Sequence, residues 1–233
     1  MFDARIKRCL LVGIGVGTAT AHAEPRVEVG GYGGWSSAKT LTYDCTQLLG
    51  TGDASCSDSI SEPHNSEGGI ALGAYVRYAV HPAVLLEADL LYAQKGENTG
   101  THTTYHYIEA PLLARVDPVR PWSHARVFAY AGLAPAIRIA CTTTGMIFDN
   151  DTHMPIDYSG SCQSLPVPLN DRVPSFFDLG LVIGAGFGYE ISFGTIELQV
   201  RYTRGLIDTQ DEGGETINRA SYFLVGYGRF IGH

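Results

Sequence analysis

The feature that constrains this chain most is an alternation of apolar and polar residues with a period of two, repeated in several long segments. Successive side chains of a β-strand point to opposite faces of the sheet, so each segment predicts a strand with one apolar and one polar face. The clearest segments are 69–78, 84–92, 177–190 and 196–202. We expect strands near 27–36, 68–79, 83–94, 105–117, 125–140, 175–190, 195–206 and 220–231.

The strand lengths and the connections between strands favour a membrane-spanning barrel. The expected strands run for about 9 to 16 residues, whereas soluble strands average about 5–6 and membrane strands need roughly 9–11. Long external loops that alternate with short periplasmic turns are typical of closed, antiparallel, up-and-down barrels in the outer membrane. An even strand number, about eight, leaves both termini in the periplasm. The long, polar links are 37–67, 95–104, 141–174 and 207–219, and the short links are 80–82, 118–124 and 191–194.

Aromatic residues near the expected strand ends predict a girdle at each membrane interface. The outer girdle would contain Trp35, Tyr92, Tyr105, Tyr202 and Tyr222. The inner girdle would contain Tyr78, Trp122, Tyr189 and Phe230. Because lipid offers no hydrogen bonds, the sheet between the girdles must close on itself and leave no edge.

The polar strand faces predict a lumen filled by ion pairs. About eight strands enclose a space that side chains just fill, and charges buried there are costly unless they are paired. Glycines on the same face would make room for the long side chains, and they are Gly180, Gly184, Gly186 and Gly188. The expected network consists of Arg77, Glu87, Asp89, Glu109, Arg115, Asp178, Glu190, Glu197, Arg201 and Arg229.

The first 23 residues have the pattern of a secretory signal peptide. Its parts are a basic start (Arg5, Lys7, Arg8), an apolar run (10–19) and a small-x-small cleavage site (Ala21-His22-Ala23). The run is shorter than the roughly 20 residues that a membrane-spanning helix needs, which argues against an uncleaved anchor. We expect 1–23 to be removed and 24–233 to form one barrel domain. The leader contributes +2 to the net charge of −8, and the −10 that remains argues against nucleic-acid binding.

Four cysteines follow the leader: Cys45, Cys56, Cys141 and Cys162. An even number in an exported chain predicts disulfides. The first two fall in one polar link and the last two in another, so local pairing is the simplest of three connectivities. A zinc site is the alternative, but the sequence has no C-x-x-C and no His residues at ligand spacing.

Three stretches resemble a known family. They are Leu90-Leu91-Tyr92-Ala93-Gln94-Lys95-Gly96, Tyr107-Ile108-Glu109-Ala110-Pro111-Leu112-Leu113-Ala114 and Phe128-Ala129-Tyr130-Ala131-Gly132-Leu133-Ala134-Pro135. They look like the "L-Y-x-Q-K-G … Y-I/L-E-I/V-P-L-L" and "Y-x-x-x-G-P" patterns of the outer-membrane β-barrel domain family that includes PorT-like proteins. The resemblance covers about Val27 to Ile231 and implies an eight-stranded outer-membrane barrel with no shared catalytic residues. Family members usually end on an aromatic residue, the signal for insertion, whereas this chain ends Phe230-Ile231-Gly232-His233.

No catalytic constellation is evident, and we do not expect an enzyme. A lipid-modifying barrel would need a Ser or Thr nucleophile, a His base and an acid at one rim. Ser123-His124 falls on the expected periplasmic side, and Ser221-Tyr222 has no evident His partner. The Gly-rich stretch 184–188 lacks the third Gly of a dinucleotide fingerprint, because that position is Tyr189.

No metal or other cofactor is expected either. His102 and His106 would lie roughly 13 Å apart on a strand, too far to share a metal. Asp149-Asn150-Asp151 and Asp157 could offer oxygens to calcium, but they lack the Gly and the closing Glu of an EF-hand loop.

The sequence therefore predicts a non-enzymatic outer-membrane barrel that displays disulfide-stapled loops for surface structure, adhesion or partner binding. One alternative is a narrow cation-preferring pore, and another is a soluble lipocalin-like carrier in the periplasm. The expected partners are outer-membrane lipid, an extracellular ligand and, during insertion, the barrel-assembly machinery and periplasmic chaperones.

Overall fold

A computed structural model of the chain describes residues 27–47, 54–56, 65–98, 101–122, 124–148, 155–164, 175–207 and 214–231. The expected leader, 1–23, lies outside the described residues. The strands are β1 (Val27–Gln47), β2 (Ala54–Cys56), β3 (Asn65–His81), β4 (Val84–Asn98), β5 (Thr101–Glu109), β6 (Leu112–Trp122), β7 (Ala125–Phe148), β8 (Pro155–Ser161), β9 (Phe177–Ile191), β10 (Gly194–Gly205) and β11 (Gly214–Ile231), and a 3-10 turn, η1, covers Cys162–Ser164. Among these described residues, no helix is both long enough and apolar enough to cross a membrane.

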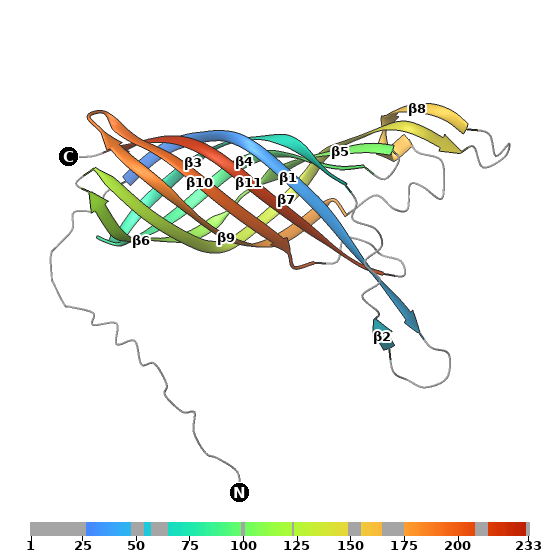
Figure 1. The fold of residues 1–233 in the computed structure, drawn as a ribbon, viewed down its shortest axis with the longest axis horizontal. Coiled ribbons are helices and arrows are strands. Elements are labelled where there is room, and N and C mark those ends of the chain that lie inside the picture. The colour runs from blue at the N-terminus through green and yellow to red at the C-terminus, as the bar shows by residue number, and fades with distance from the viewer. Residues whose placement is uncertain are drawn as a thin grey trace, which may run out of the picture.

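The strands form a closed, antiparallel, up-and-down barrel with eight strand positions, as the alternation predicts (Figure 1). The order around the ring is β1, β3, β4, β5 with β6, β7, β9, β10 and β11, and β11 pairs with β1 to close it. The expected strand 105–117 is interrupted at Ala110 and Pro111, and its two parts, β5 and β6, both lie between β4 and β7. Hydrogen bonds from Asp89 N to Pro111 O (2.9 Å) and from Ala110 N to Pro135 O (2.8 Å) continue the ladder across this break.

The strand register fixes the tilt of the barrel. The outward row of paired residues that starts at Val29 on β1 passes once around the ring and returns to β1 at Lys39, ten residues further along. Ten residues at about 3.3 Å, over eight strands about 4.8 Å apart, correspond to a tilt of roughly 40°. This tilt lies within the range of natural barrels and leaves an interior that side chains fill.

The two ends of the barrel differ. At one end, which we call the turn end, β1 begins and β11 finishes, and short turns join β3 to β4 and β9 to β10. The opposite end, the loop end, carries the strand extensions β2 and β8 (Figure 1). In outer-membrane barrels short turns face the periplasm and long connections face outward.

The apolar strand faces point outward. Leu90 is 60% exposed, whereas its neighbour Leu91 is fully buried inside. Leu72 is 54% exposed, and its neighbour Ala71 is fully buried. A lipocalin-like carrier, the alternative left open by the sequence, would need the reverse arrangement, with its apolar faces inside.

One of the expected long loops needs correction. The segment 95–104 is not a long loop: β4 runs to Asn98 and β5 begins at Thr101, with only 99–100 outside the described residues. Thr103 and Thr104 favour extended backbone and pair with Thr143 and Thr142 of β7, which continues to Phe148.

The aromatic girdles are smaller than expected. Trp35, Tyr92, Tyr202, Tyr78 and Tyr189 lie on the outward face. Tyr105 and Tyr222 are buried inside, because they share a strand face with lumen residues. Phe230 also has a lumen-side register position, with the Arg126 guanidinium 6.0 Å from its ring centroid. The side chain of Trp122 lies outside the described residues.

Candidate functional site

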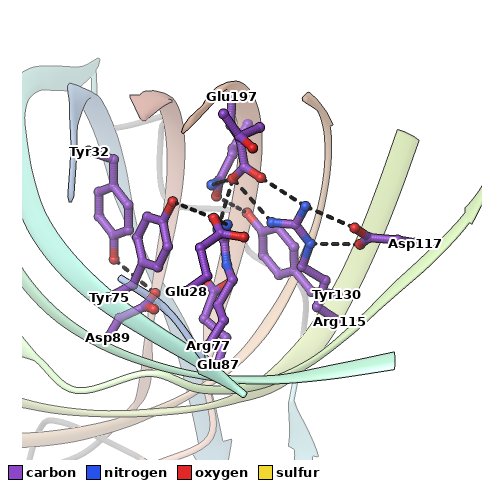
Figure 2. Close-up of polar contacts among 12 residues, drawn as sticks. Glu28, Tyr32, Tyr75, Arg77, Glu87, Asp89, Arg115, Asp117, Tyr130 and Glu197 are labelled. Atoms are coloured by element: carbon purple, nitrogen blue, oxygen red, sulfur yellow. Dashed lines mark hydrogen bonds and ion pairs between the residues drawn. The ribbon is translucent and has the colours of Figure 1, made fainter. Parts of the chain in front are cut away.

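A connected set of nine charged side chains fills the turn-end half of the lumen. Figure 2 shows the part of this set around Arg77, Arg115 and Glu197. The residues of the whole set come from six of the eight strand positions, and their side chains are no more than 7% exposed. We call this set the lumen network; its members are Glu28, Arg77, Glu87, Asp89, Arg115, Asp117, Arg126, Glu197 and Arg201. Period-two alternation places them inside, because each shares a face with the other buried residues of its strand.

Glu197 on β10 is the centre of the network and is fully buried. Its carboxylate accepts hydrogen bonds from Arg77 Nη2 (2.8 Å), from Arg115 Nη2 (2.8 Å) and Nη1 (3.1 Å), and from Gln199 Nε2 (3.0 Å). Arg126 Nη2 lies 3.4 Å from the same carboxylate. One negative charge is thus shared by three guanidinium groups from three different strands.

Arg77 extends the network toward the opposite wall. It pairs with Glu28 on β1 at 2.9 Å and with Glu87 on β4. Arg201 then joins Glu87 (3.7 Å) to Asp89 (2.7 Å), and the Tyr32 hydroxyl donates to Asp89 at 2.8 Å. The chain of ion pairs therefore crosses the lumen from β10 to β4.

Aromatic rings pack against the guanidinium groups. Arg115 lies 3.5 Å from the ring centroid of Phe128, and Arg77 lies 3.8 Å from that of Tyr75. Such cation–π contacts stabilise a desolvated guanidinium. The lumen glycines of β9 provide the space, since a Cβ at Gly184 or Gly186 would overlap with Tyr130 or Phe128.

A second, smaller cluster lies nearer the loop end. Lys95 pairs with Glu109 at 2.7 Å, and the Tyr222 hydroxyl donates to Glu109 at 2.8 Å. Lys95 Nζ also lies 4.6 Å from the ring centroid of Tyr107. These side chains are almost fully buried, so the lumen contains ion pairs at two levels.

The structure brings six of the ten expected lumen residues into the lumen network: Arg77, Glu87, Asp89, Arg115, Glu197 and Arg201. Glu109 belongs to the second cluster, and Asp178 is buried and accepts from Asn218 Nδ2 at 3.1 Å. Glu190 is half-buried near the turn end. The placement of Arg229 in the lumen is wrong: it is exposed and pairs in register with the outward Val29.

Four charged members of these clusters are absent from the sequence prediction: Glu28, Lys95, Asp117 and Arg126. The alternation could have found Glu28 and Asp117, which share faces with Tyr32 and Arg115. Lys95 lies in 95–104, which the sequence predicts as a loop. Arg126 was missed because both faces of the segment 125–140 are apolar and the inward face is not evident.

At the loop end, Cys141 of β7 forms a disulfide with Cys162 of η1, with the Cα atoms 5.5 Å apart. The Cys162 sulfur lies 3.2 Å from Thr143 Oγ1, which contacts Thr103 Oγ1 at 3.1 Å. The bond thus ties η1 to β7, which pairs with β5 and β8. For the other expected pair, the backbone register places Cys45 on β1 opposite Cys56 on β2.

The sites considered for catalysis and metals are dispersed. Ser221 is exposed on the outward face, the His124 ring is tilted against that of Tyr189 with the centroids 6.2 Å apart, and Ser123 lies outside the described residues. His106 contacts the Tyr92 hydroxyl at 2.7 Å. Asp157 is exposed on β8, and 149–151 lie outside the described residues. Within the described part of the chain, no group of three or more His, Cys, Asp or Glu residues is placed to hold a metal.

Comparison with known proteins connects this geometry to a family. The sequence model described as "Outer membrane protein beta-barrel domain" matches residues 9–229. A search of curated proteins finds no match.

Three solved structures illustrate the likeness in fold. Neisserial surface protein A is 13% identical, with a TM-score of 0.47 over 89% of this chain and 99% of that one. OprG from Pseudomonas aeruginosa is 12% identical, with a TM-score of 0.47 over 88% and 96%. The outer membrane protease OmpT from Escherichia coli is 9% identical, with a TM-score of 0.45 over 88% and 97%. At these identities the likenesses assign no function.

Proposed function

Because the chain belongs to the outer membrane protein beta-barrel domain family, we propose that it is a non-enzymatic outer-membrane barrel that holds disulfide-stapled loops outside the cell. Those loops serve surface structure, adhesion or the binding of an extracellular partner. The observation that carries this proposal is the combination of two features. The lumen is filled by ion pairs, and the β7–β8 hairpin projects at the loop end and is closed by the Cys141–Cys162 disulfide.

The filled lumen supports a display role rather than transport. Four arginines and five carboxylates occupy the turn-end half, and each arginine has an acidic partner within 4.0 Å. Moving a hydrated ion through this region requires several buried pairs to separate, and breaking one such pair costs roughly 3–5 kcal/mol.

The projecting hairpin supports display directly. β7 pairs with β9 only as far as Ile137, and its last eleven residues continue beyond that neighbour for roughly 36 Å along the strand. There β7 is flanked by β5 and β8, and the three strands form a small sheet that extends past the barrel (Figure 1). The Cys141–Cys162 bond restricts this sheet, which suits a surface that must keep its shape and resist proteases.

A deletion experiment tests the display role. Residues 143–160 are replaced by a short Gly-Ser link, and cells producing either form are compared for adhesion to immobilised extracellular-matrix proteins. The proposal predicts that adhesion falls while the protein remains in the outer membrane with a heat-modifiable band. Unchanged adhesion, or loss of the folded band, would contradict it.

A narrow cation-preferring pore is the second candidate, because carboxylates outnumber arginines in the lumen network by five to four. Planar-bilayer recording separates the two functions. The display proposal predicts no steady current steps, whereas regular cation-selective steps would put the pore first.

A further inference from the structure

A polar hollow lies at the turn end of the barrel, between the β9–β10 turn and the end of β11 (Figure 1). It has a volume of about 390 Å³. Its charged residues are Glu190 and Arg229, and Ser192 and Thr195 add hydroxyl groups. We call this hollow the rim pocket. One cation and one anion at the edge of a membrane barrel suit a ligand that carries both signs of charge.

An apolar hollow adjoins it on the outward wall. This open groove has a volume of about 690 Å³, and its floor is β1 at Gly31 and Gly33, which have no side chains to fill it. Its sides are Leu72 on β3 and Val225 and Tyr227 on β11, each at least 42% exposed. We call it the wall groove. None of the described residues that line it is charged, so it suits an acyl chain.

The rim pocket and the wall groove are continuous, because Ile191 and Phe193 of the β9–β10 turn line both. The Tyr227 hydroxyl donates to the carbonyl oxygen of Phe193 at 2.7 Å, and the two ring centroids lie 6.1 Å apart. These contacts hold the turn where the polar and apolar surfaces meet. A single molecule with a polar end and an apolar end can therefore occupy both hollows.

The rim pocket lies at the level of the inner lipid interface. Arg229 is opposite Val29 on one side of β1, and Tyr78 is opposite Val27 on the other side. At a tilt of roughly 40°, this register places Arg229 within roughly 3 Å of Tyr78 along the barrel axis. Tyr78 is an outward aromatic residue of the inner girdle, where lipid headgroups begin.

The two charges of the rim pocket are arranged in an order that fits one lipid headgroup. Arg229 is exposed on the outward side, whereas Glu190 is half-buried and pairs in register with Thr195 on the lumen side. Because Thr195 also pairs with Gly228, Glu190 and Arg229 are two strand spacings apart, roughly 10 Å between Cα atoms. Guanidinium groups bind phosphate, and carboxylates accept hydrogen bonds from ammonium groups.

We propose that the rim pocket and the wall groove together bind a phospholipid of the periplasmic leaflet whose headgroup contains a phosphate and a primary ammonium group. Arg229 binds the phosphate on the outward side of the rim, and Glu190 accepts from the ammonium group beneath the rim. An acyl chain lies along Gly31 and Gly33 in the wall groove. This inference requires only the outer-membrane location and does not depend on the display role.

Lipid retention by the folded, detergent-solubilised protein tests the proposal and is measured by native mass spectrometry. The probes are phosphatidylethanolamine, phosphatidylglycerol, which lacks the ammonium group, and glycerophosphoethanolamine, which lacks the acyl chains. The test variants are Arg229→Gln and Glu190→Gln for the headgroup and Gly33→Leu, which fills the wall groove. The matched control is Arg204→Gln, which removes an exposed cation of β10 near the loop end. Heat-modifiability verifies that each variant is folded.

The proposal predicts that the unmodified protein retains phosphatidylethanolamine up to about fivefold more strongly than phosphatidylglycerol, the upper range for an exposed ion pair. Glu190→Gln should remove this preference, whereas Arg229→Gln should weaken the retention of both lipids about fivefold. Gly33→Leu should weaken the retention of both lipids and keep the preference. Arg204→Gln should leave both lipids within roughly twofold of the unmodified protein.

Four results would overturn the proposal. The first is equal retention of the two lipids by the unmodified protein, and the second is an equal loss of retention in Arg204→Gln and Arg229→Gln. The third is unchanged retention in Gly33→Leu, which would exclude an acyl chain from the wall groove. The fourth is displacement of the lipid by glycerophosphoethanolamine at equal concentration, which would indicate a site for the soluble headgroup alone.

Discussion

Replacing Glu197 by Gln tests whether the lumen network stabilises the barrel. The substitution keeps the volume of a fully buried side chain but removes the negative charge shared by Arg77, Arg115 and Arg126. It also turns one acceptor oxygen into an amide donor that faces guanidinium donors. Breaking a buried pair by neutralising one partner costs roughly 3–5 kcal/mol. With a denaturant dependence near 2 kcal/mol per M, the urea midpoint should fall by roughly 1.5–2.5 M.

The assay is urea unfolding of the barrel in detergent micelles, followed by loss of the heat-modifiable band. Glu190→Gln is the matched control, because Glu190 is half-buried on the neighbouring strand, and its midpoint should move by less than about 0.3 M. A double-mutant cycle with Arg115→Met should give a coupling energy of roughly 1–3 kcal/mol. If Glu197→Gln unfolds at the same urea concentration as Glu190→Gln, the network does not stabilise the barrel and the reasoning fails.

Two further predictions concern the pairing of β1 with β11, which closes the barrel, and the disulfide. Gly34→Val should abolish the compact unboiled band, because its Cβ would overlap with the main chain of Phe223 and Leu224 on β11. Gly33→Ala should keep this band, because its Cβ would meet a flexible Leu72 methyl at 3.0 Å and the Ala71 carbonyl oxygen at 4.0 Å. A Gly34→Val barrel that migrates normally would refute the close packing of β1 against β11 at this position. Cys141→Ser with Cys162→Ser should leave the barrel midpoint unchanged while limited proteolysis cuts the loop-end sheet faster; an unchanged digestion pattern would show that the bond does not restrict it.

The faces of the strands could be predicted from the sequence because the alternation is strict where a strand has one apolar side. In β4, Glu87 and Asp89 alternate with Leu86, Ala88 and Leu90, and the inward face is evident. In β7 the inward positions include Phe128 and Tyr130, which are as apolar as the outward ones. Hydrophobicity alone therefore could not show that Arg126 joins the lumen.

The position of a residue near a strand end predicted its location less well than the strand face to which it belongs. Tyr222 lies near a strand end, but it shares a face with Leu224 and so points into the lumen, where it donates to Glu109. Arg229 is charged, but it shares its face with the outward Tyr227 and so does not reach the lumen. Charge and aromaticity indicate which residues need an ionic partner or a membrane interface. The odd or even position of a residue along its strand decides whether its side chain points inward or outward.

The register of strand pairing around the ring could not be predicted from the sequence. Arg77 on β3 pairs with Glu28 on β1 and Glu197 on β10, and these residues, far apart in the chain, meet only through the register of β3, β1, β11 and β10. A shift of one residue in any of these pairings would turn one of the three side chains to the other face. The individual ion pairs could be recognised only once the register was known.

The measurement that tests the central claim most directly is fluorescence quenching of single tryptophans on the two opposite faces of β3. In a background with Trp35→Phe and Trp122→Phe, Leu72→Trp places the probe outward and Tyr75→Trp places it inward, where the native side chains are 54% and 4% exposed. The account predicts that brominated lipid quenches the probe at Leu72, and that neither brominated lipid nor aqueous acrylamide quenches the probe at Tyr75. Acrylamide quenching at Tyr75 would contradict a filled lumen, and a probe at Leu72 shielded from lipid would contradict the outward apolar face itself.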